Sequence, residues 1–301
     1  MLRARAALAL LPLLLAACAA QSDDAASGSE DITGEDKPRL LAIGDSITFA
    51  WNPLLETDMH KVDARKYPGY TDMLGADLGL GVDNGACPGE TSGAMLDKNA
   101  EDNGCRDNRA AYALHTSWGD HAPQIDFATS YLRDAIAKGK APELVVMTMG
   151  GNDLLVMEHH CTLPSLLNDV CKLAKLPFTV HAFGDHISQI AKDIDATGYK
   201  GTFVVISTYA PDYSDVVAKL ALTQMNGELK EHVEGLAGEL QNTKVVVADG
   251  YGAFEAVASQ HGGKTCETGL LIKKADGTCD IHPTQAGHRV LADAVKKALG
   301  R

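Results

Sequence analysis

The sequence predicts an α/β protein, a three-layer α/β/α sandwich around a central, mostly parallel sheet. Short apolar runs recur along the chain without polar–apolar alternation, which is typical of strands covered on both faces. Helical patterns lie between these runs, and alternating strands and helices indicate right-handed crossovers within one parallel sheet. No internal repeat and no second apolar core is evident, so we expect a single domain.

The expected elements follow from these two patterns. The strand candidates are, in chain order, Arg39–Gly44, Glu143–Met149, Thr202–Ser207 and Lys244–Ala248. The helix candidates are Asp185–Gly198, with Ile187, Ile190 and Ile194 on one face, then Asp215–Leu240 and Ala286–Leu299. Gly287 is the weak point of the last helix, because glycine is a poor helix former.

The N-terminal 17 residues predict an export signal. They carry two arginines and an apolar run that is too short for a membrane-spanning helix. The run ends in Leu-Ala-Ala-Cys, which resembles the lipobox of bacterial lipoproteins, so Cys18 would be the lipidated first residue of the mature protein. A plain secreted protein is the alternative. Residues 18–37 are small, polar and acidic and predict a flexible tether, and residues 38–301 would form the single domain.

Composition restricts the possible partners. Hydrophobic residues make up 45% of the chain, enough for a sizeable core, and the formal net charge is −13. An acidic body argues against nucleic acid as a partner and against electrostatic attraction to anionic lipid. Contact with a membrane would therefore depend on the lipid on Cys18, and we expect a monomer.

The seven cysteines fit an oxidising compartment. Setting Cys18 aside leaves three local couples, and the economical pairing is Cys87–Cys105, Cys161–Cys171 and Cys266–Cys279. The run Glu158–Cys161, Glu-His-His-Cys, could instead be a metal-ligand cluster. No second His/Cys pair stands at zinc spacing, so we expect loop histidines and no metal.

Polar side chains follow two of the expected strands. Ser46 comes directly after the first strand, in Gly-Asp-Ser, and Asn152 comes directly after the second. Ligands of open parallel sheets bind at the carboxyl ends of the strands. Each residue alone also has an ordinary explanation, since Asp and Ser cap helices, Asn and Gly form turns, and a histidine such as His282 can simply lie on the surface.

Taken together and in order, these residues resemble the SGNH hydrolase family, also called GDSL esterases and lipases. The resemblance covers about Arg39 to Ala298 and implies a flavodoxin-like sandwich. Its four blocks are Gly44-Asp45-Ser46-Ile47, with isoleucine for the usual leucine; Asn84 with Gly89; Gly150-Gly151-Asn152-Asp153; and His282-Pro283.

The resemblance implies a serine hydrolase that cleaves carboxylic esters through an acyl-enzyme, with no cofactor. Ser46 would be the nucleophile and His282 its base. The backbone N–H groups of Ser46 and Gly89 and the side-chain amide of Asn152 would form the oxyanion hole. We expect Asp45 and Asp153 to stabilise the local backbone.

One position departs from the family pattern. The aspartate that usually stands three residues before the histidine is Cys279 here, and the nearest carboxylate is Asp280, two residues before His282. Residues two apart share a side only on an extended backbone. Asp280 therefore orients His282 only if the local chain is extended, and the rival partner is a main-chain carbonyl just upstream.

The substrate side stays open at this level. Residues 154–184 form a long, mostly apolar insertion that either walls an acyl groove or is a helical hairpin packed into the core. Other activities of the same family, carbohydrate O-acetyl esterase or lysophospholipase and thioesterase, are alternatives, and a non-catalytic surface-binding lipoprotein is an alternative of another class. We expect an exported protein, anchored on the cell surface or periplasmic side, or otherwise secreted.

Overall fold

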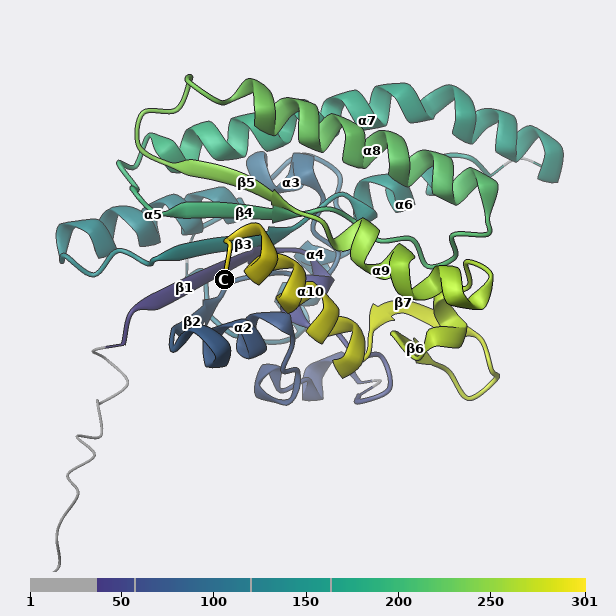
Figure 1. Cartoon of the computed structure of the whole chain (residues 1–301), viewed down its shortest axis with the longest axis horizontal. Coiled ribbons are helices and arrows are strands. Elements are labelled where there is room, and N and C mark those ends of the chain that lie inside the picture. The colour runs from purple at the N-terminus through teal and green to yellow at the C-terminus, as the bar shows by residue number, and fades with distance from the viewer. Residues whose placement is uncertain (1–36, 57, 120, 163) are drawn as a thin grey trace, which may run out of the picture.

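The computed structural model describes residues 37–301 except 57, 120 and 163. The expected signal peptide, Cys18 and nearly all of the tether lie outside the described residues. The core is a five-stranded sheet of order β2-β1-β3-β4-β5, in which every neighbouring pair is parallel (Figure 1). Its strands are β1 (Arg39–Gly44), β2 (Gly81–Asn84), β3 (Leu144–Thr148), β4 (Thr202–Ile206) and β5 (Lys244–Ala248).

Helices cover both faces of this sheet. One face packs on α5 (Gln124–Ala137), α7 (Ser165–Asp195) and α8 (Val216–Gly235), and the other on α2 (Tyr70–Leu78), α9 (Gly250–Ala258) and α10 (Gln285–Ala298). Successive residues of a strand alternate between the two cores: Leu41 and Val145 belong to the first, Leu40 and Val146 to the second. The predicted three-layer sandwich is therefore confirmed.

The shorter elements lie mainly around the carboxyl edge of the sheet. They are α1 (Ser46–Phe49), α3 (Ser92–Leu96), α4 (Cys105–Ala111), α6 (Gly151–His159), the 3₁₀ helices η1 (Met59–Lys61), η2 (Ala64–Lys66), η3 (Ser259–His261) and η4 (Thr265–Thr268), and an antiparallel pair, β6 (Leu271–Lys273) with β7 (Cys279–Pro283). The structure also contains the three expected disulfides.

Each predicted strand is present to within one residue, but three strands were missed. β2 is an edge strand of four residues, Gly-Val-Asp-Asn, with no apolar run to reveal it, and β6 and β7 are similarly short. The helix expected over Asp185–Gly198 is the end of α7, which begins 20 residues earlier, at Ser165, and continues through Pro177. The expected start of that helix was therefore wrong.

Gly287 has a packing reason to be in α10. A Cβ atom at this position would lie 2.3 Å from the carbonyl oxygen of Leu270, closer than atoms can approach. The first turn of α10 can therefore pack against the chain that enters β6. Within the described part of the chain, no helix has the length and apolarity needed to cross a lipid bilayer.

Candidate active site

Ser46 is presented at the carboxyl edge of the sheet by a tight strand-to-helix turn. Gly44 ends β1 with φ of +120°, and a Cβ atom there would lie 2.3 Å from the carbonyl oxygen of Thr148 on β3. Asp45 caps α1, because its carboxylate accepts a hydrogen bond from the Ile47 N–H at 3.0 Å. Ser46 is consequently the first residue of α1.

His282 reaches Ser46 from β7. The distance from its Nε2 to the Ser46 Oγ is 2.9 Å, and its Nδ1 is hydrogen-bonded to the Asp280 carboxylate. β7 is extended, which is the condition under which Asp280 lies on the same side as His282. The Ile281 carbonyl, just upstream of the histidine, accepts a hydrogen bond from the Tyr209 hydroxyl at 2.6 Å.

Charge at this cluster favours one tautomer of the histidine. Burial raises the pKa of the Asp280 carboxyl, but the hydrogen bonds and positive charge of His282 and Lys274 outweigh burial, so this pKa lies below its ordinary value. A charged Asp280 accepts a hydrogen bond from Nδ1–H, so the proton of the neutral imidazole stays on Nδ1 and the lone pair of Nε2 faces the Ser46 hydroxyl. The arrangement can remove a proton from Ser46.

Asn152 lies in the first turn of α6 with its amide fixed at both ends. Its Oδ1 accepts a hydrogen bond from the Asn103 side chain at 2.9 Å, and its Nδ2 donates to the Glu90 carbonyl, also at 2.9 Å. A primary amide carries a second N–H. That second donor remains for a ligand in the cavity that Asn152 and Ser46 both line.

Gly89 is also held by Asn103, through the backbone. Its φ is +87°, and a Cβ atom at this position would lie 2.4 Å from the Asn103 carbonyl oxygen. The Asn103 N–H in turn donates to the Gly89 carbonyl at 2.8 Å. Asn103 was missed from the sequence, where nothing except its place two residues before Cys105 distinguishes it. Asn84 shapes the turn that leads to Gly89, donating to the Thr48 carbonyl and accepting from the Ala86 N–H.

Three carboxyl groups lie near these residues, those of Asp45 and Glu90 buried and that of Asp153 half-buried. Burial raises the pKa of Asp45 and of Asp153 to about 6 each and that of Glu90 to about 8. Asp45 accepts from the Thr148 hydroxyl at 2.7 Å, and Asp153 from the Ser92 N–H. Both aspartates thus hold backbone and side chains near the site, as the sequence suggested.

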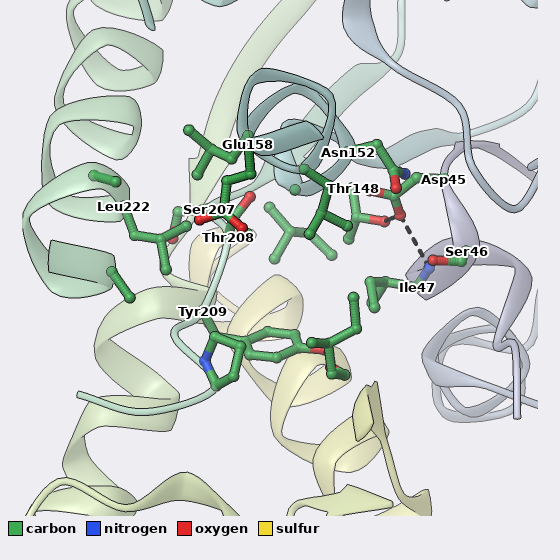
Figure 2. Close-up of a pocket in the computed structure, with 18 of the residues that line it drawn as sticks. Asp45, Ser46, Ile47, Thr148, Asn152, Glu158, Ser207, Thr208, Tyr209 and Leu222 are labelled. Atoms are coloured by element: carbon green, nitrogen blue, oxygen red, sulfur yellow. Dashed lines mark hydrogen bonds between the residues drawn. The ribbon is translucent and has the colours of Figure 1, made fainter. Parts of the chain in front are cut away.

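An apolar cavity of about 280 Å³ opens beside Ser46. Figure 2 shows Ser46 and Asn152 on one side of it and Leu222 of α8 on the other. Its lining is mostly aliphatic and includes Ile47, Leu154, Leu155, Leu222, Ile281 and Leu291. A hydrocarbon chain attached to a group at Ser46 can therefore be buried here.

Residues 154–184 divide between the cavity wall and the core. Leu154, Leu155 and Met157 of α6 line the cavity, whereas Leu176, Val180 and Phe183 of α7 are buried in the core. The Glu158–Cys161 run is not a metal cluster with a thiolate ligand, because Cys161 is bonded to Cys171. His160 pairs with Glu101, with 2.8 Å between Nε2 and Oε2.

Comparison with known proteins gives one family. The model of the GDSL-like lipase/acylhydrolase family matches residues 42–290. No curated protein matches the sequence significantly.

Three solved structures share the fold at low sequence identity. Phospholipase A1 from Streptomyces albidoflavus is 17% identical, with a TM-score of 0.52 over 87% of this chain and 99% of its own. A protein from Parabacteroides merdae assigned as a GDSL-like lipase is 12% identical, with a TM-score of 0.52 over 88% and 96%. An acetylxylan esterase from Geobacillus stearothermophilus is 16% identical, with a TM-score of 0.50 over 88% and 94%.

Proposed function

The chain belongs to the GDSL-like lipase/acylhydrolase family and is a carboxylic ester hydrolase, and we propose that Ser46 is its nucleophile. The observation that carries the proposal is the connected series of Ser46, His282 and Asp280, with 2.9 Å between the serine Oγ and the histidine Nε2 and with Ser46 lining the apolar cavity. A serine needs such a base, and the base needs an orienting group, to attack an ester.

The reaction would proceed in two halves. His282 takes the proton of Ser46 as Oγ attacks the ester carbonyl, and it then gives that proton to the departing alcohol, leaving an acyl-enzyme. Water, deprotonated by His282, then releases the carboxylic acid. Asp280 holds Nδ1 and stabilises the positive charge that the imidazole acquires in each half.

The developing oxyanion would be held by three donors. The backbone N–H groups of Ser46 and Gly89 and the Nδ2 of Asn152 are the candidates, and the positions of the last two are fixed by contacts to Asn103. Donors fixed in advance stabilise charge without reorganising during the reaction.

The shape of the cavity favours esters with an acyl chain of several carbons. An acetyl group would leave most of the aliphatic lining without contacts, whereas each buried methylene contributes about 0.8 kcal/mol. We therefore infer that the substrates are esters of medium or long acyl chains, in preference to acetylated sugars.

The enzyme would act outside the cytoplasm. The three disulfides are stable only in an oxidising compartment, and the N-terminal sequence has the pattern of an export signal. Lipidation of Cys18 would then attach it to a membrane.

A fluorophosphonate probe tests the nucleophile directly. We expect the probe to label the wild type and not Ser46→Ala, and a panel of p-nitrophenyl esters from acetate to palmitate to give its highest kcat/KM above acetate. Ser92→Ala is the matched control, a second buried serine near the site that lines no part of the cavity. Labelling that persists in Ser46→Ala, or a complete absence of labelling, would contradict the proposal.

A further inference from the structure

Two histidines and a glutamate lie close together on α7 and α8, and none of them lines the cavity beside Ser46. His181 belongs to α7, and Glu228 and His232 lie one turn apart on α8. One side-chain ligand atom of each lies within 4.8 Å of the other two. Helices α7 and α8 run side by side along their length in Figure 1, so these residues join neighbouring elements of the same layer.

We propose that His181, Glu228 and His232 bind a divalent transition-metal ion, with Zn²⁺ as the best match. Two imidazole nitrogens and one carboxylate oxygen are a ligand set that Zn²⁺ uses in proteins, with water in the fourth position. Imidazole-containing sets favour zinc and similar ions over Mg²⁺ or Ca²⁺, which prefer oxygen ligands only.

His232 is already oriented as a metal ligand. Its Nδ1 lies 2.9 Å from the Ser188 hydroxyl, and its Nε2 lies 3.3 Å from the Glu228 carboxylate. Bound histidines commonly donate their other ring N–H to a fixed partner, which sets the tautomer and the direction of the free nitrogen. In the tautomer whose Nδ1–H donates to the Ser188 hydroxyl, the lone pair of Nε2 is available to the proposed ion.

Gly184 makes room for this ring. A Cβ atom at position 184 would lie 2.4 Å from the Cδ2 and 2.5 Å from the Nε2 of His232, so a larger residue in α7 would displace the imidazole. Gly184 and Ser188 of α7 therefore fix the position of the His232 ring between the two helices.

Binding of the ion by all three ligands would require a small movement of the His181 side chain. Ligand atoms around a tetrahedral zinc with bonds of 2.0–2.2 Å lie roughly 3.4 Å apart, so the 4.8 Å span must close by a little over 1 Å. The His181 side chain is 69% exposed. It pairs with Asp185, with 3.6 Å between Nε2 and Oδ2, and its ring lies edge-on to the ring of His232. It can rotate toward the ion without disturbing the core.

A bound ion would link α7 to α8 and would take no part in ester hydrolysis. The amino half of α8 supplies Ala218, Ala221 and Leu222 to the cavity, and the ligands lie farther along the same helix. The sequence did not indicate this site, because its histidines are far apart in the chain and only the packing of α7 on α8 brings them together.

Zinc titration of the full-length protein tests the site. We expect the metal-free wild type to bind one equivalent of Zn²⁺ by isothermal titration calorimetry, with a rise in melting temperature that EDTA reverses. His181→Ala should weaken binding at least tenfold and abolish the temperature shift while leaving the metal-free melting temperature unchanged, since this side chain is exposed. Glu228→Gln, which keeps the size of the side chain, should weaken binding similarly.

His261→Ala is the control, because His261 is an exposed histidine outside the cluster. It should bind zinc as the wild type does. His160→Ala is a second control, because His160 also lies beside a carboxylate, that of Glu101, outside the cluster. It should bind zinc as the wild type does. Absence of zinc binding to the wild type, unchanged affinity in His181→Ala and Glu228→Gln, or loss of binding in His261→Ala or His160→Ala would each overturn the proposal. Failure here would leave the proposed nucleophile unaffected, since the Ser46 labelling does not depend on these residues.

Discussion

Asn152 shows how one side chain can be prepared for catalysis by its neighbours. Its amide is held by Asn103 on the oxygen and by the Glu90 carbonyl on the nitrogen, so its remaining N–H has a fixed direction. We expect Asn152→Ala to lower kcat by on the order of 100- to 1,000-fold, because one oxyanion donor typically contributes about 2.7–4 kcal/mol. Steady-state kinetics with p-nitrophenyl butyrate measure this.

Asn103→Ala separates positioning from direct contact. Without the Asn103 side chain, the Asn152 amide keeps only its hydrogen bond to the Glu90 carbonyl and is less firmly oriented, so kcat should fall by less than in Asn152→Ala while KM changes little. The contacts of Asn103 with Gly89 are made by its backbone and remain in Asn103→Ala, so the Asn103 side chain acts only through the Asn152 amide. The double variant should therefore be no slower than Asn152→Ala alone. Additive losses in the double variant would argue against this relation.

Glu90 predicts a pH-dependent contribution to stability. Burial raises the pKa of its carboxyl from 4.5 to about 8, so between these values the folded chain holds a proton that the unfolded chain has lost. The stability associated with the neutral form is complete below about pH 4.5 and is lost as the pH rises to about 8. Glu90→Gln resembles the protonated form and does not titrate.

The free energy of unfolding of Glu90→Gln, relative to wild type, should therefore increase from pH 5 to pH 8 and then level off. Urea denaturation across this range measures it, with Glu239→Gln as a control at an exposed position. Parallel curves for Glu90→Gln and the wild type would contradict the prediction.

At the scale of elements, β7 is the strand on which the histidine depends. It pairs only with the short β6 in the part of the chain that the structure describes, and Cys279 ties its first residue to Cys266. We expect the double replacement of Cys266 and Cys279 by alanine to lower kcat strongly as well as the melting temperature, because His282 loses its fixed approach to Ser46.

The Cys161–Cys171 disulfide supplies the comparison. It closes a loop of similar length, with a sequence separation of 10 against 13, so each bond should contribute about 3 kcal/mol on the chain-entropy model. Replacing Cys161 and Cys171 by alanine should lower the melting temperature with a much smaller effect on kcat. Equal losses of kcat in the two double variants would show that β7 needs no such support.

Helix α8 should set the acyl length, because it forms the wall opposite Ser46 in Figure 2. Ala221→Phe would fill part of the cavity. We expect kcat/KM for long acyl chains to fall at least tenfold while that for acetate changes little, measured with a series of p-nitrophenyl esters. Gln224→Phe, exposed on the same helix and outside the cavity lining, should leave the profile unchanged. A proportional loss for every ester would instead indicate general damage to the site.

At the scale of the whole molecule, the strands predicted from sequence were those whose burial is visible in composition. β1, β3 and β4 are continuous apolar runs because both faces are covered, and β5, at the edge of the sheet, keeps an apolar run although most of it is only half-buried. β2, by contrast, carries Asp83, which pairs with Arg39, and its place in the sheet is set by this neighbour and by backbone pairing. α7 was only half predicted because Pro177, a strong helix breaker, is tolerated in its interior.

Some residues of the candidate site could likewise be predicted from the sequence, and others could not. Ser46 and Asn152 could be proposed because they follow predicted strands, and His282 because it completes the ordered motif blocks that resemble the family. Asn103 and the residues that line the cavity could not be proposed, because nothing in their local sequence distinguishes them from other asparagines and leucines. Only the packing of the folded chain brings them to the site. The partner of His282 stayed open in the sequence because the choice between Asp280 and a carbonyl depends on backbone conformation.

The proposed lipid anchor on Cys18 predicts where the enzyme acts. If residues 18–37 are the flexible tether that their composition predicts, they would hold the domain within roughly 25 Å of a lipid on Cys18, as a chain of about 20 residues spans on average. Cys18→Ser should move the enzyme from the membrane to the soluble fraction without changing kcat/KM for a soluble butyrate ester. Its rate on esters presented in native membranes should fall, because the local concentration created by the tether is lost. Fractionation and the two assays distinguish these effects, and a Cys18→Ser enzyme that remained with the membrane would contradict anchoring through Cys18.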